Sequence, residues 1–195
     1  LSFSIALFFL IPATISHWVG NITNVTNTWT TNLFEGIIRI LILITYMWSI
    51  GRMDDIKRVF GYHGAEHKTI NAYESGAELT PEVVITYPIE HPRCGTAFLL
   101  TVMLFSVLIF TLIGPVPSLL IKLGLRVLLI PVVASISYEY IRWTAKHLDS
   151  PFVQFLIKPN LALQKMTTEP PTLAMIEVSI ASFEAMLALE NENKI

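Results

Sequence analysis

The sequence predicts an all-α, polytopic membrane protein with about four transmembrane helices, a cytoplasmic helical loop and C-terminal amphipathic helices. Of its 195 residues 53% are apolar and only 14% are charged, a balance typical of a chain whose solvent is lipid. Long apolar runs alternate with short polar segments. We therefore expect two transmembrane helices and a short outer loop in residues 1–50, a cytoplasmic loop in 51–96, a helical hairpin in 97–143 and a cytoplasmic tail in 144–195.

The first two spans are predicted from apolar runs near the start of the chain. The run Leu1–Ile15 is short for a span, and it is either a transmembrane helix cut at its start or a signal-peptide-like segment. The absence of an initiator Met and of a basic segment before it favours the transmembrane helix. The run Ile37–Ile50 is broken only by Arg39 and extends back to Leu33, which gives the ~18 residues that a span needs.

The third span is the run Thr96–Gly114, which contains no ionisable residue. It ends at Gly114, Pro115 and Pro117, and these residue types break a helix and favour a tight turn. A helical hairpin is therefore expected from this run and the next.

The fourth span is predicted over Ser118–Trp143, with a kink at Pro131. Its first two turns carry Lys122 and Arg126, four residues apart and hence on one helix face. We expect these two side chains to extend toward the nearer membrane interface.

The distribution of basic residues predicts the orientation of a multi-pass protein of the cell membrane. The segment Ser16–Phe34 has no Lys, Arg, Asp or Glu and is expected to be the outer loop. The segment Gly51–Arg93 carries five Lys or Arg residues, so the positive-inside rule places it in the cytoplasm. The C-terminal tail is expected on the same side because a hairpin of two helices separates it from this loop.

The tail is predicted to contain two amphipathic parts. Residues Pro151–Lys165 mix apolar and polar side chains in short pieces split by Pro159, which indicates an interfacial segment. A helix follows in which apolar residues recur at helical spacing: Leu173, Ile176, Ile180, Phe183 and Leu187. We expect its apolar stripe to pack on the cytoplasmic loop or on a neighbouring protein.

One short motif in the cytoplasmic loop points to chemistry. Residues 63–67 read H-x-x-E-H, the inverted order of the zinc-hydrolase signature. On a helix, His63 and His67 stand one turn apart on one face and can point at a single divalent metal ion, for which zinc is the best match. Glu66 could then activate a metal-bound water as general base.

Further metal ligands are expected among His91, Cys94 and Glu139, since zinc accepts imidazole, thiolate and carboxylate. Three protein ligands would make a catalytic site and four a structural one. Ordinary structural roles compete with this prediction: three fixed positions in five residues can coincide by chance, Glu66 can form an ion pair, Cys94 can be a packing residue, and Glu139 can pair with Arg142 or Arg93.

The sequence indicates neither a nucleic-acid partner nor an internal disulfide bond. The formal net charge is −2, and no basic patch interleaved with aromatic residues appears, so nucleic acid is not an expected partner. The single Cys94 permits no internal disulfide, which fits a reducing compartment or a metal-ligand role. The expected partners are the lipid bilayer and another membrane protein complex.

Four motifs in order carry a resemblance to a known family: FGYHGAEHK at residues 60–68, HPRCGT at 91–96, SYEYIR at 137–142 and QKMTT at 164–168. Together they resemble the YqhQ-like family of bacterial membrane proteins, a family of unknown function often labelled predicted metal-dependent enzymes. The resemblance covers nearly the whole chain. Family members usually begin with a segment like GGQAVMEGVMMRG, which this sequence lacks, so a ligand supplied by that segment would be missing here.

Two functions are therefore expected. The first is an integral-membrane metal-dependent enzyme, a hydrolase that reaches its substrate from the cytoplasmic headgroup layer. The second is a non-enzymatic accessory subunit of a membrane complex, such as a protein-insertion or transport machine, with a structural metal or none. The short outer loop and the amphipathic tail motivate the second prediction, because neither outlines a substrate chamber.

Overall fold

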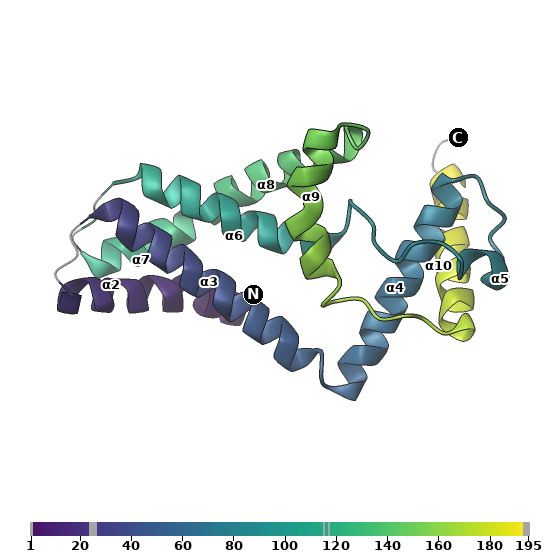
Figure 1. Cartoon of the computed structure of the whole chain (residues 1–195), viewed down its shortest axis with the longest axis horizontal. Coiled ribbons are helices and arrows are strands. Elements are labelled where there is room, and N and C mark those ends of the chain that lie inside the picture. Colours follow the sequence, from purple (N-terminus) through teal and green to yellow (C-terminus); the bar gives the residue numbers. More distant parts are fainter. Residues whose placement is uncertain (1, 24–26, 115, 117, 193–195) are drawn as a thin grey trace. The chain divides into compact units, whose positions relative to one another are not determined.

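A computed structural model describes residues 2–23, 27–114, 116 and 118–192, and these residues form helices joined by loops, without a strand among them (Figure 1). The chain folds as two compact units. One comprises Leu1–Tyr46 with Gly95–Asn160, and the other comprises Met47–Cys94 with Leu161–Ile195. We refer to them as the membrane unit and the site unit.

The membrane unit contains the apolar helices. In chain order they are α1 (Ser2–Ile5), the π-helical segment η1 (Ala6–Leu10), α2 (Ile11–Thr23), α3 (Thr28–Ile50), α6 (Gly95–Leu112), α7 (Leu119–Leu128), α8 (Ile130–Lys146) and the first part of α9 (Pro151–Gln164). Three helical stretches are long and apolar enough to cross a membrane: 2–23, 29–50 and 95–112. A fourth span results if α7 and α8 count as one span bent by 41°.

The sides of these helices carry the surface expected of a protein in lipid. Large apolar side chains such as Leu41, Leu108 and Leu120 are exposed, whereas Phe9, Phe110 and Val133 pack together inside the unit. Exposed aliphatic side chains on helices that are long and apolar enough to cross a membrane indicate that the surrounding solvent is hydrocarbon. The prediction of an all-α, polytopic membrane protein is thus confirmed.

Several sequence expectations about the spans need correction. The connection between the first two spans is shorter than Ser16–Phe34, the segment expected to be the outer loop, because α2 continues to Thr23 and α3 begins at Thr28. The side chain of Asn27 caps α3: its Oδ1 accepts hydrogen bonds from the backbone N–H groups of Trp29 and Thr30 at 2.9 and 3.4 Å.

The bends of the hairpin also differ in detail. The break in the fourth span lies at Leu129, two residues before Pro131, because proline fits the first turn of α8. Pro159 lies inside α9 and does not split it. Gly114 ends the α6 region with a φ of +79°, which suits glycine, while Pro115 and Pro117 lie outside the described residues.

Lys122 and Arg126 do not extend toward an interface. Both side chains are buried, and each forms an ion pair with Glu35 on α3. The sequence pattern predicts the shared face of the two cations but not this partner, since nothing in a local pattern links residues about ninety positions apart.

The site unit is built around α4 (Asp54–Glu74), the short α5 (Pro81–Val84) and α10 (Leu173–Glu192). The first turn of α4 carries Asp54 and Asp55, which favour the helix N-terminus. Figure 1 shows α4 and α10 side by side. Their shared core joins Ala65, Ala72, Val84, Ile176 and Ile180, so the apolar stripe of the tail helix packs on loop 51–96, the first of the two alternatives expected for it.

Candidate metal centre

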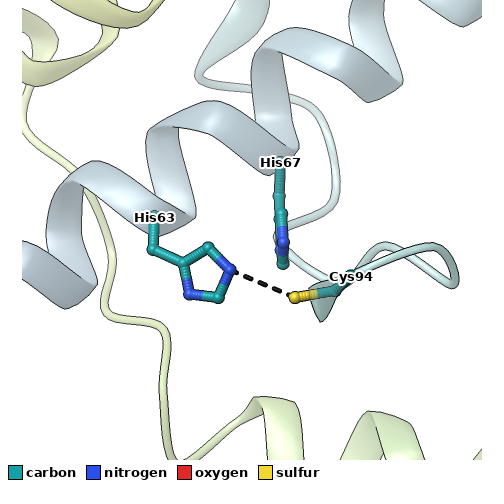
Figure 2. A group of neighbouring side chains, drawn as sticks. All are labelled: His63, His67 and Cys94. Carbon is teal, nitrogen blue, oxygen red and sulfur yellow. Dashed lines mark hydrogen bonds between the residues drawn. The ribbon is translucent and has the colours of Figure 1, made fainter. Parts of the chain in front are cut away.

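Helix α4 presents two histidines on one face, one turn apart. His67 is buried and His63 is half-buried, and their ring centroids lie 4.3 Å apart. Figure 2 shows both rings reaching from α4 toward Cys94. The four-residue spacing therefore has the geometric consequence that the sequence predicted.

Backbone carbonyl groups set the orientation of both rings. His63 Nδ1 lies 2.8 Å from the carbonyl oxygen of Thr167, and His67 Nδ1 lies 2.7 Å from that of Ile89. Because a carbonyl oxygen only accepts, each Nδ1 must carry the proton and donate it. Each Nε2 is then the atom available to a metal, and the carbonyl groups act as the outer shell that fixes the tautomer.

Cys94 completes a group of three donors. Its side chain is buried, and its Sγ lies 3.1 Å from His63 Nε2 (Figure 2). The ligand atoms of His63, His67 and Cys94 all lie within 4.8 Å of one another, and no other His, Cys, Asp or Glu of residues 2–23, 27–114, 116 and 118–192 joins this group. The cluster is thus able to hold one metal ion.

The donor set fits zinc in type and approximately in distance. Zinc binds imidazole nitrogen at ~2.0–2.1 Å and thiolate sulfur at ~2.3 Å, so a tetrahedral site places nitrogen and sulfur about 3.5 Å apart. The 3.1 Å separation of His63 Nε2 and Cys94 Sγ is close to this value, and donors within 4.8 Å need only a small side-chain rotation to close the third contact. Two imidazoles and one thiolate are borderline-soft ligands, which suit zinc better than magnesium or calcium.

The hydrogen bond between His63 and Cys94 also affects protonation. The pKa of His63 is raised, chiefly because the Cys94 side chain hydrogen-bonds the ring, with a further contribution from the Thr167 carbonyl, against the opposing effect of burial. Glu66 adds a smaller favourable charge interaction. A proton and a metal ion therefore compete for the same nitrogen of His63.

Side chains of α4 hold the segment that leads to Cys94. Lys68 Nζ donates to the carbonyl oxygens of Ile85 and Tyr87, the former at 2.9 Å. Asn71 Nδ2 donates to those of Pro88 and Glu90 at 2.8 and 3.0 Å. With His67 bound to Ile89, residues 67, 68 and 71 thus bond five carbonyl groups of one segment, 85–90. Burial lowers the pKa of Lys68.

Gln164 holds the next part of this segment. Its buried side chain bonds both the N–H and the carbonyl group of His91. Sequence reasoning missed Gln164, Lys68 and Asn71 as positioning residues, although the spacing of His67, Lys68 and Asn71 on one side of a helix was a usable signal.

His91 lies near the group but is not part of it. Its ring centroid is 5.9 Å from that of His67, and its Nε2 lies 3.6 Å from a carboxylate oxygen of Glu74, which also pairs with Arg93. Within the described chain, this buried Nε2 has no hydrogen-bond partner. Burial lowers the pKa of His91, so the ring is neutral at pH 7. Of the two residues expected as a third ligand, the structure brings Cys94 to the histidines.

Glu66 is exposed and lies on a different side of α4 from the buried His67. It lines a groove of about 360 Å³ between α4 and α10, together with Tyr62, Ser179 and Phe183 among others. The structure thus places the expected general base in the lining of this groove, which neither His63 nor His67 lines, and not among the three donors.

Glu139 belongs to the membrane unit, where it is exposed on α8 and lies 3.7 Å from Arg142. This is one of the two ion pairs considered as its ordinary structural role. Arg93, the other candidate partner, pairs with Glu74 instead.

Comparison with known proteins agrees with the four sequence motifs. A family model described as "Protein of unknown function (DUF1385)" matches residues 1–189. The chain belongs to this family. The "Uncharacterized protein YqhQ" of Bacillus subtilis (strain 168) is 39% identical over 156 residues, which cover 80% of this chain and 49% of that protein.

This DUF1385 chain thus spans about half the length of the curated relative it matches. No solved structure matches the chain. The family description names no activity, so a functional assignment depends on the geometry of the site.

Proposed function

We propose that the chain is an integral-membrane, zinc-dependent enzyme of the hydrolase class. One observation carries the proposal: His63 and His67 on α4 and Cys94 before α6 converge with their ligand atoms within 4.8 Å, while carbonyl groups hold the remaining nitrogen of each ring. Three protein ligands of these types are typical of catalytic zinc sites, which keep one coordination position for water or substrate.

The chemistry divides between the ion and the protein. A bound zinc ion supplies Lewis-acid catalysis, which polarises a substrate oxygen and lowers the pKa of water. The protein positions the three ligands, and Glu66, three residues after His63 on α4, accepts and returns the proton of the attacking water. Its exposed position leaves the carboxylate accessible to a substrate that enters through the groove between α4 and α10.

We further propose that loop 51–96 and the C-terminal tail lie in the cytoplasm. The excess of Lys and Arg in 51–93 over 16–34 supports this orientation through the positive-inside rule. A site reached from the cytoplasmic face of the membrane suits a substrate in the headgroup layer.

The test is metal analysis of the purified chain by inductively coupled plasma mass spectrometry. About one zinc ion per chain is expected for the wild type and for H147A, which alters a histidine of the membrane unit. H63A, H67A and C94A are expected to lose the ion, while H91A and E66Q retain it. Absence of metal from the wild type after zinc loading would overturn the proposal.

Activity is tested separately with p-nitrophenyl acetate and p-nitrophenyl phosphate in mixed micelles. E66Q is expected to reduce hydrolysis by about 10²–10⁴-fold, the range of general acid–base catalysis, while keeping the metal. Loss of metal from E66Q would instead make Glu66 a ligand, and unchanged hydrolysis would remove it from the mechanism.

A second candidate is the accessory subunit of a membrane protein complex. Exposed apolar side chains on α10, including Val178, Met186 and Leu189, favour it, because such a row is suited to docking. A metal ion would then hold the 85–94 segment on α4. Purification with a fixed, stoichiometric membrane partner, together with zinc content but no hydrolysis, would support this candidate over the first.

A further inference from the structure

Four charged side chains are buried inside the membrane unit and take no part in the metal site. Glu35 and Arg39 lie on α3, and Lys122 and Arg126 lie on α7. Glu35 Oε1 accepts hydrogen bonds from Arg39 Nη2 at 2.8 Å and from Arg126 Nε at 2.9 Å. Its Oε2 lies 3.0 Å from both Arg126 Nη2 and Lys122 Nζ. Each carboxylate oxygen thus already serves two donors.

The charges of this cluster do not balance. Three cations surround one carboxylate, and residues 1–46 and 95–138 contain no other Asp or Glu. Two positive charges in the spans therefore lack an acidic partner from these segments. Because an ion in a low-dielectric interior is stable only when its charge is compensated, this excess is a strong reason to expect a bound anion.

Neutral groups hold the two guanidinium groups in place. Arg39 donates to the Phe8 carbonyl oxygen at 2.7 Å and to Ser106 Oγ, and Arg126 donates to Asn32 Oδ1 at 2.9 Å. The ring of Phe110 lies 3.9 Å from the guanidinium carbon of Arg126 and 5.3 Å from that of Arg39. These contacts orient the cations but bring no negative charge, so the excess remains.

The position of Lys122 indicates where an anion would enter. Lys122 lies in the first turn of α7, about 5 Å along the helix axis from its start at a rise of ~1.5 Å per residue. It is also the least buried of the three cations, at 7% exposed. The cluster therefore reaches the end of the spans where α6 ends and α7 begins.

We propose that Lys122 and Arg126 bind a phosphate group, carried by an anionic phospholipid. Phosphate oxygens accept strong, charge-assisted hydrogen bonds from ammonium and guanidinium groups, and one phosphodiester charge reduces the excess. An apolar groove of about 480 Å³ runs between α3 and α6 and is lined by Trp29, Leu33, Leu108 and Leu112 among others. Asn32 Nδ2 donates to the Phe110 carbonyl oxygen at 3.0 Å at the same helical turns. An acyl chain fits this groove, which favours a lipid over free phosphate as the source.

The experiment compares thermal unfolding of the full chain in neutral detergent with three additions: phosphatidylcholine, phosphatidylglycerol, or phosphatidylcholine with inorganic phosphate. Phosphatidylglycerol is expected to raise Tm above the value in phosphatidylcholine for the wild type, for K122R and for R142Q. Arg142 is a matched control, because its exposed side chain faces exposed Glu139. The increase is expected to be lost in K122Q.

A second measurement covers the case that K122Q does not fold. Native mass spectrometry of the wild type in an equal mixture of the two lipids is expected to retain phosphatidylglycerol in excess. If inorganic phosphate raises Tm as much as phosphatidylglycerol does, the phosphate site stands and its source is soluble. Equal Tm in all three additions with no retained anionic lipid would overturn the proposal, as would a full increase in folded K122Q.

Discussion

The side chain of Gln164 forms two hydrogen bonds with the backbone of His91. Gln164 Oε1 accepts from the His91 N–H at 2.8 Å, and Gln164 Nε2 donates to the His91 carbonyl oxygen at 2.8 Å. The Gln164 amide thus pairs with the backbone as a neighbouring β-strand would, and it anchors the chain three residues before Cys94. A ligand that comes from a loop needs such an anchor to keep its sulfur near the two histidines on α4.

Replacing Gln164 by Ala should therefore damage both stability and metal binding. Two buried backbone groups would lose their partners, at a cost of about 1–3 kcal/mol each. Loss of this anchor should also weaken zinc binding, because it no longer holds the segment that carries Cys94. Chemical denaturation and a competitive zinc titration measure the two effects. Q154A, at an exposed position of the same helix, is the control and should change neither.

Cobalt substitution should identify the sulfur ligand. Cobalt loaded into the wild type is expected to show a near-ultraviolet thiolate-to-metal charge-transfer band, because Cys94 Sγ is one of the three donors. The band should disappear in C94S and persist in H91A. A band that survives in C94S would exclude Cys94 as a ligand.

Zinc binding should weaken as the pH falls. The pKa of His63 is raised above its ordinary value of 6.5 by the hydrogen bond with Cys94, so protons compete for this nitrogen already near neutral pH. Below that pKa the ring is protonated, and affinity should fall by about tenfold per pH unit for each proton displaced. Titration against a chelator of known pH dependence at pH 8, 7 and 6 measures this, and an affinity that does not change with pH would contradict it.

Gly64 should not tolerate a side chain. A Cβ atom there would lie 2.4 Å from the Glu169 carbonyl oxygen and 2.8 Å from Ile89 Cδ1. Both the 85–90 segment and the backbone at Glu169, which leads to α10, would therefore have to move. G64A is expected to destabilise the fold by about 1–3 kcal/mol, as overpacking does, and to lower zinc affinity. G124A has no atom within 4 Å of its Cβ and should be neutral or up to about 1 kcal/mol stabilising. Equal Tm for the two variants would refute the close packing at Gly64.

Removing the charge of Glu35 should be costly. E35Q leaves three buried cations without a carboxylate, and breaking a buried ion pair in this way costs about 3–5 kcal/mol. Unfolding in mixed micelles with increasing denaturing detergent measures the loss. E139Q is the control, since Glu139 is exposed and a surface change of this kind is usually worth within about 0.5 kcal/mol.

Much of the fold could be predicted from local periodicity in the sequence. Apolar runs of sufficient length predicted the spans, and the four-residue spacing of His63 and His67 predicted a shared face because helix geometry alone decides it. The apolar stripe through Ile176 and Ile180 likewise predicted a packed tail helix. Each of these inferences depends on residues within a few turns of one another.

Contacts between residues far apart in the sequence could not be predicted from local periodicity. Cys94 lies 31 positions from His63, and no sequence pattern chose it over His91 as the third donor. The anchor from Gln164 to His91 spans 73 positions, and the pair between Glu35 and Arg126 spans 91. Such pairs follow from how the helices pack, which a single sequence does not specify.

The carbonyl contacts of the two histidines restrict each imidazole to a single coordinating atom. Because the carbonyl groups of Thr167 and Ile89 hold both Nδ1 atoms, a metal ion that binds through Nδ1 would have to break a hydrogen bond at each ring. A cation that binds through the Nε2 atoms, on the side of the Cys94 sulfur, meets no such cost.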